Sequence, residues 1–175
     1  MKHLIQIVFL ICSSLMVSGQ EIDLSKEFAQ MEQYLSSIEI SNSNVSEAPV
    51  KWHLLHSLQV INGVIDMAGK SDPDSFNSKT NIKWRYVSIF GKIPRGQVKA
   101  PDVVNPTFRI SKKDIMNELN KAKLSLLDWK NLQKNSYYEH HVLLHLNKRK
   151  IRRFLKVHTR HHLKIIRDIL KAENN

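Results

Sequence analysis

Two histidines near the C-terminus have the spacing of a metal-binding pair. The stretch FLKVHTRHHLKII, residues 154–166, places three histidines among leucines and isoleucines. On a helix, His158 and His162 lie one turn apart and project from the same face. Two imidazoles at this spacing can bind one divalent ion, as they do on zinc-protease helices. The alternative is a pair of buried core histidines held by hydrogen bonds. A second pair with the same spacing, His141 and His145, lies in a stretch that need not be helical.

An earlier apolar segment supplies a third histidine. The segment KWHLLHSLQVI, residues 51–61, puts His56 on its apolar stripe, and His53 can share that face from three residues before it. We expect His56 to meet His158 and His162 across a helical core, with His53 as the ligand if the register differs by one turn. Three neutral imidazoles leave coordination positions for water or substrate, as in catalytic sites. Zn, Ni and Fe all suit such ligands.

These histidines need a helical framework to bring them together. The hydrophobic periodicity predicts four long amphipathic helices and one short helix. An all-α fold follows, a four-helix bundle with an extra short helix and a long proline-containing connection after it. Residues 134–146 are predicted as a turn region, and no strand series is apparent. The helices are expected at residues 21–40, 49–68, 82–90, from 111 onward and at 148–172.

Four residues are predicted to mark where these helices begin or end. Gly69 is expected as the C-cap of the second long helix. Ser111 and Asp114 form a capping box at the start of the third. Asn147 is expected to cap the last helix. The boundaries therefore rest on local chemistry as well as on periodicity.

The N-terminus has the layout of a secretory signal peptide. Lys2 and His3 precede an apolar run, and small residues follow before Gln20. We expect a signal peptide over residues 1–19, one domain over residues 20–175, and a secreted or periplasmic protein without a stable membrane span. The alternative is an uncleaved anchor. Cys12 is the only cysteine and lies within this segment, so a mature chain would have neither a disulfide nor a thiolate ligand.

The chain is strongly basic, with a formal net charge of +11. This charge favours anionic partners, and the alternative is a solvated basic face. Export argues against a nucleic-acid partner. In the long connection, Lys92, Arg95 and Lys99 are candidates for clamping an anionic substrate near the mouth of the site.

The sequence resembles a known family. WHLLHSLQVI, followed much later by HLNKRKIRRFLKVHTRHHLKII, looks like the DinB-like superfamily of four-helix bundles, which includes YfiT-type metal-dependent hydrolases and thiol S-transferases. GKIPRGQVKAPDVVNP is similar to the DUF1569 branch. The resemblance implies a metal triad of His56, His158 and His162 and a homodimer as a candidate assembly. His140 fits a further family histidine by its spacing, and with His53 and His161 it is a candidate to line the site.

Two functions follow as expectations. The first is a divalent-metal-binding protein with hydrolase or transferase chemistry on an unidentified small-molecule substrate. The second is a non-enzymatic exported protein that binds anionic partners through its basic surface. A general base is not evident, because Asp66 lies nearly three helical turns beyond His56 and Glu139 has no predicted position near the site. Low-molecular-weight thiols belong mainly to the cytosol, which disfavours thiol transfer in an exported protein.

Overall fold

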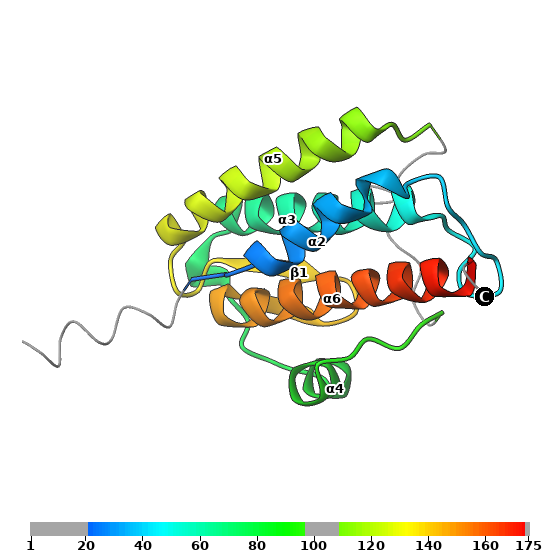
Figure 1. The fold of residues 1–175 in the computed structure, drawn as a ribbon. Helices are drawn as coiled ribbons and strands as arrows, with labels where there is room; N and C mark the ends of the chain where they lie inside the picture. Colours follow the sequence, from blue (N-terminus) through cyan, green and yellow to red (C-terminus); the bar gives the residue numbers. More distant parts are fainter. Residues whose placement is uncertain (1–20, 97–108, 174–175) are drawn as a thin grey trace, which may run out of the picture.

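The chain is predominantly helical, with one two-stranded sheet (Figure 1). The computed structural model describes residues 21–96 and 109–173. The helices are α2 (Ser25–Gln33), α3 (Val50–Lys70), α4 (Ile82–Phe90), α5 (Lys112–Asp128) and α6 (Lys148–Glu173). The strands are β1 (Tyr137–His140) and β2 (Leu144–Asn147), and 3-10 turns occur at Tyr34–Ser36, Pro73–Ser75 and Trp129–Asn131.

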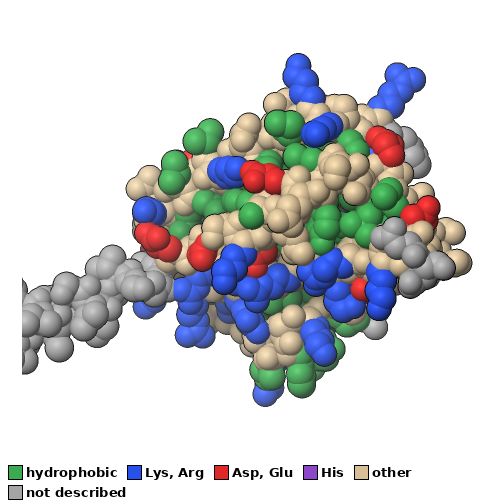
Figure 2. All heavy atoms as spheres, in the orientation of Figure 1, with side chains coloured by type: hydrophobic (Ala, Val, Ile, Leu, Met, Phe, Trp, Pro, Cys, Tyr) green, Lys and Arg blue, Asp and Glu red, His purple; other side chains and the backbone are tan. Residues whose placement is uncertain are grey.

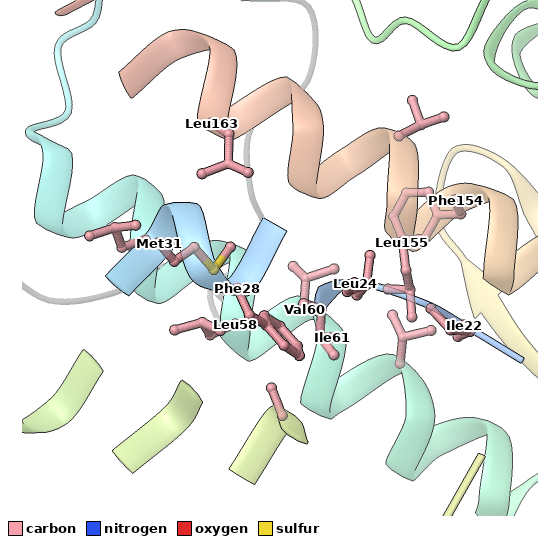
Figure 3. Packing of buried hydrophobic residues seen from close by; sticks show 14 of the residues in the cluster. Ile22, Leu24, Phe28, Met31, Leu58, Val60, Ile61, Phe154, Leu155 and Leu163 are labelled. Carbon is pink, nitrogen blue, oxygen red and sulfur yellow. The ribbon is translucent and has the colours of Figure 1, made fainter. Parts of the chain in front are cut away.

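Helix α3 is the central element of the core. It packs against α5 on one side and α6 on the other, while α2 packs on α6 and α4 lies outside α6 (Figure 1). Apolar side chains from three helices gather between them, with Phe28 from α2, Ile61 from α3 and Leu155 from α6 all buried (Figure 3). The contact between α3 and α6 positions the histidines of both helices.

The first helix is shorter than the sequence predicts. The prediction was a helix over residues 21–40, whereas α2 ends at Gln33 and a 3-10 turn follows it. The reason lies at the start of α3. The backbone N–H of Val50 donates to the carbonyl of Ile40 at 3.0 Å, and that of Lys51 donates to Ile38 at 3.1 Å. The segment after α2 therefore satisfies the first amides of α3, which have no partner within their own helix.

The predicted end of α3 was wrong, whereas the two other predicted caps are confirmed. Helix α3 runs through Gly69 and ends with Ser71 as its C-cap. The Ser71 hydroxyl donates to the carbonyl of Ala68 and accepts from the N–H of Tyr137, each at 2.8 Å, which fastens β1 to the end of the helix. The Ser111–Asp114 capping box is present, and Asn147 Oδ1 accepts from the N–H of Lys150 at 3.2 Å.

Residues 134–146 contain strands where a turn region was predicted. Strands β1 and β2 pair antiparallel, with Tyr138 opposite Leu146. Leu146 is fully buried and β2 leads directly into α6. Strands of four residues carry little period-two signal, so hydrophobic periodicity does not predict them. Leu144 begins β2 with a left-handed backbone, φ 63°.

No helix of the described residues is long and apolar enough to cross a bilayer. The predicted signal peptide, residues 1–19, lies outside the described residues, as does Lys99 of the predicted anion clamp.

Candidate metal centre

Helices α3 and α6 bring three histidines together. One ring nitrogen each of His56, His158 and His162 lies within 4.8 Å of the other two. His56 and His162 are buried and His158 is partly buried. His56 is separated from the α6 pair by about a hundred residues of chain, so only the packing of α3 on α6 can produce this cluster. The predicted proximity of the three residues is confirmed, and their role as ligands stays a prediction.

The spacing of the nitrogens suits a single ion. His56 Nε2 lies 3.3 Å from His158 Nε2. Zinc–nitrogen bonds of about 2.0–2.1 Å in a tetrahedral site separate two ligand nitrogens by about 3.3–3.4 Å. The His56 ring centroid lies 4.7 Å from that of His162, and the His158 and His162 centroids lie 4.6 Å apart. An N–H···N hydrogen bond is the metal-free way to satisfy the same 3.3 Å contact.

His53 contacts the site from behind His162. Its Nδ1 lies 3.0 Å from Nδ1 of His162, and its Nε2 lies 3.0 Å from the hydroxyl of Ser46. If His162 donates from Nδ1, its Nε2 is unprotonated and can bind a metal, while His53 Nε2–H donates to Ser46. This is the arrangement by which outer residues fix the tautomer of a metal-binding histidine. The triad contains His56 rather than His53, so the one-turn register alternative is not adopted.

Trp52 stacks on His56 and was missed as a site residue. The two rings are nearly parallel, 12° apart, with centroids separated by 4.7 Å. The Trp52 ring also meets His53 edge-on at 5.2 Å. This stacking restricts the orientation of the His56 ring. The four-residue spacing of Trp52 and His56 on one helix was the available signal, because residues at that spacing are neighbours on the helix surface.

His158 is held less firmly than His162. Its Nδ1 is buried and has no hydrogen-bond partner among residues 21–96 and 109–173. Its ring packs against Phe154, with centroids 5.4 Å apart. His162 therefore has His53 as a partner for its Nδ1, whereas Nδ1 of His158 has no hydrogen-bond partner among the described residues.

The environment keeps these histidines uncharged. Burial lowers the pKa of His158 and of His162 well below the ordinary value, and neighbouring imidazoles add to the effect. Burial likewise lowers the pKa of His53 and that of His161 to about 4. Neutral imidazoles retain the lone pairs that a metal requires. A site that disfavours protonation of its histidines is therefore suited to binding a cation through them.

No acidic side chain joins the cluster within the described ranges. Asp66 is exposed and pairs with Lys70 at 2.8 Å. Glu139 is exposed, and its carboxylate lies 4.0 Å from His145 in the hairpin. An ion in this site would have only imidazole ligands from the described part of the chain, and no carboxylate of that part is placed to act as a general base.

The other predicted site residues surround the cluster without joining it. The His161 ring lies 5.1 Å from that of His162, and the backbone of Ile93 partly offsets the lowering of its pKa by burial. His140 uses Nδ1 to accept from the N–H of Val142 at 3.0 Å.

One side chain of the predicted anion clamp, that of Arg95, already has an acidic partner. Arg95 forms an ion pair with Asp168, so its charge is already partly neutralised. Lys92 is exposed and forms no ion pair among the described residues. Arg95 is still close enough to His161 and His53 for its charge to help lower the pKa of each. Its position favours an uncharged histidine cluster more directly than it favours a bound anion.

Comparison with known proteins found no matching family model, no matching curated protein and no matching solved structure. The similarity to the DinB-like superfamily thus rests on the sequence motifs alone. The function has to be argued from the histidine cluster and from the surface of the protein.

Proposed function

We propose that this protein binds a divalent metal ion, Zn, Ni or Fe, through His56, His158 and His162. The observation that carries the proposal is the convergence of three ring nitrogens within 4.8 Å from two helices far apart in sequence. The contact between His53 and His162 and the stacking of Trp52 on His56 support it, because both restrict the orientation of candidate ligands. Outer residues that restrict ligand orientation in this way are typical of metal sites.

The wider proposal is an exported four-helix bundle of the DinB type. Helices α2, α3, α5 and α6 would be the four bundle helices, with α4 and the hairpin as additions. A signal peptide over residues 1–19 would direct export. The sequence motifs support the family, and the helical content is compatible with it.

The reaction class we propose is metal-dependent hydrolysis or group transfer on a small molecule. A three-histidine ion retains open positions and supplies Lewis acidity or an activated water. The residues of this chain would hold the ion, orient His162 through His53 and keep the site uncharged. Because no carboxylate lies in the described part of the site, a proton acceptor would come from the substrate or from bulk water.

Metal content measured by mass spectrometry on the tag-free protein tests this proposal. We expect near-stoichiometric metal in the wild type and none in a His158→Ala/His162→Ala variant. The matched control is His141→Ala/His145→Ala, which removes two histidines at the same spacing from the hairpin and should retain the metal.

Thermal unfolding with added metal tests the same site in case the protein loses its ion during purification. Added Zn²⁺ at about a hundred times its dissociation constant should stabilise the wild type by about 2.7 kcal/mol, and chelator should reverse this. The control variant should respond likewise, and the His158→Ala/His162→Ala variant should not. Absence of metal together with unchanged melting in Zn²⁺ and Ni²⁺ would show that the histidines are core packing.

A further inference from the structure

Helix α4 has an apolar face that no described residue covers. Trp84 and Val87 are buried on the side that faces the core. Four other apolar side chains follow at steps of four, three and one residues and are largely exposed. This α4 patch consists of Ile82 (74% exposed), Tyr86 (40%), Ile89 (67%) and Phe90 (60%). Apolar spheres at the lower end of the molecule in Figure 2 lie over α4. Scattered exposed apolar residues are ordinary, but four on one side of a nine-residue helix indicate an interaction surface.

The helix that carries the patch is firmly placed. Its N-terminus is capped by Asn81, whose Oδ1 accepts from the N–H of Trp84 at 2.8 Å. Gly91 ends it in the left-handed conformation, φ 59°. Arg153 of α6 donates to the carbonyl of Ser88 at 3.1 Å, and α4 packs on α6 as the outermost helix (Figure 1). The patch therefore projects from a fixed position on the surface.

Cations surround the patch, and α4 itself carries no acidic residue. Lys83 and Arg85 are exposed on α4. The outward side of α6 continues the positive charge with Arg149, Arg153 and Lys156 at helical spacing, and Figure 2 shows Lys and Arg side chains gathered above α4. Among the described residues, none of these five cations forms an ion pair.

The second half of the same α6 stripe differs. Arg160 pairs with Glu27 at 2.7 Å and Lys164 with Asp168 at 3.0 Å. Along this stripe of α6, the cations near α4 are thus available for an external anionic partner.

We propose that the α4 patch and its basic rim dock on the surface of an anionic lipid bilayer. Apolar side chains on one face of a short helix can enter the boundary between headgroups and acyl chains, and flanking Lys and Arg bind anionic headgroups. This inference does not depend on metal binding.

A second copy of the chain fits the same surface less well. Four side chains on a nine-residue helix present much less than the roughly 800 Å² per partner of a stable interface. Pairing two such faces would also bring two basic rims together, which is repulsive. A bilayer surface requires no such area, because insertion of a few apolar side chains and headgroup attraction act together.

Co-sedimentation of the full chain with vesicles tests the proposal. We expect binding to vesicles containing phosphatidylglycerol and phosphatidylcholine, weaker binding to phosphatidylcholine alone, and loss of the difference at high salt. Ile89→Ser/Phe90→Ser should weaken binding by about tenfold or more. The matched control is Leu124→Ser/Leu127→Ser on α5, whose side chains are 63% and 61% exposed, and it should bind as the wild type does. All variants share residues 1–20, so any contribution of that segment is common to them.

The basic rim is tested separately. Lys83→Gln/Arg85→Gln should weaken binding to the anionic vesicles by roughly fivefold per charge. Each Lys or Arg near an anionic surface adds about this factor to the binding affinity. Lys121→Gln/Lys134→Gln removes the same charge from exposed positions elsewhere and should have a smaller effect.

A local probe reports whether α4 itself enters the bilayer. An environment-sensitive dye at Phe90→Cys, in a Cys12→Ser background, should shift to the emission of an apolar environment on anionic vesicles, whereas the same dye at Leu124→Cys should not. Absence of binding to anionic vesicles, or equal losses in the α4 and α5 variants, would overturn the proposal. So would a concentration-dependent dimer that Ile89→Ser/Phe90→Ser dissociates while vesicle binding stays unchanged.

Discussion

The protein contains two histidine pairs with the same four-residue spacing, and only one of them joins a cluster of three histidines among the described residues. His158 and His162 lie on α6 and meet His56 from α3. His141 and His145 lie in and beside the β1–β2 hairpin, where four residues no longer amount to one helical turn. A four-residue spacing places two rings on one face only when the backbone between them is helical. A four-residue histidine spacing therefore predicts a cluster only where a helix carries both residues.

The partners of the two pairs differ as well. Hairpin histidines are engaged by nearby backbone, because His145 Nδ1 accepts from the N–H of Asn77 at 3.1 Å and its ring stacks on Tyr137 at 4.3 Å. His141 is exposed and stacks on His140 at 4.7 Å. The α6 histidines instead face other imidazoles. Nδ1 of His145 is thus occupied by a backbone N–H, and the hairpin histidines do not gather into a cluster of three ring nitrogens as His56, His158 and His162 do among the described residues.

Removal of His53 should have the largest effect on the difference in metal binding between the two histidine pairs. His53→Ala should weaken metal affinity by about 10–100-fold, because loss of an outer partner releases the orientation and tautomer of His162. Isothermal titration with Zn²⁺ measures the effect. His145→Ala removes a hydrogen bond between the hairpin and Asn77, likewise made across a large sequence separation, and should leave the affinity unchanged. Wild-type affinity in His53→Ala would mean that its contact with His162 has no role in binding.

The sequence predicted the proximity of the three histidines better than it predicted the elements around them. His56, His158 and His162 were identified because both of their helices carry a long apolar stripe that fixes which side faces inward. Neither Trp52 nor the link from His53 to Ser46 was predicted as part of the site. The position of Ser46 depends on how residues 37–49 return to α3, and this path is set by backbone hydrogen bonds to Ile38 and Ile40 that no periodicity reveals.

Helix caps were predicted correctly where residues within a single turn form the cap. The Ser111–Asp114 box and Asn147 act within a single turn, so their chemistry is visible in the sequence. The end of α3 depends on Ser71 binding the start of β1, a contact over 66 residues, and Gly69 gave a misleading local signal. The hairpin was not predicted for a similar reason, because its strands are defined by their pairing with each other rather than by a hydrophobic pattern within each strand.

Acid should reveal the titration of His140, a hairpin histidine outside the three-histidine cluster. Burial, together with His141, lowers the pKa of His140 from 6.5 to about 4 in the folded protein. Between these two values the unfolded chain binds more protons, so the free energy of unfolding falls as the pH falls from about 6.5 to 4 and is insensitive to this group above that window. His140 is partly exposed, so its full shift is discounted to about 1 kcal/mol.

Urea unfolding of the metal-free protein at several pH values measures this dependence. His140→Gln should flatten part of the slope between pH 6.5 and 4, whereas His141→Gln, at an exposed position, should leave it nearly unchanged. An equal slope in the wild type and His140→Gln would show that His140 titrates alike in the folded and unfolded chains.

The smallest expected effect tests whether the hairpin and the site are energetically separate. Leu144 has a left-handed backbone, which costs a non-glycine residue about 1 kcal/mol, and its side chain is largely exposed. Asparagine tolerates this conformation and a β-branched residue does not, so Leu144→Asn should raise the free energy of unfolding by about 0.5 kcal/mol and Leu144→Val should lower it. Zn²⁺ affinity should stay constant in both. A change in affinity that followed stability would mean that the hairpin transmits strain through α6 to His158, and the two histidine regions would then be one coupled unit.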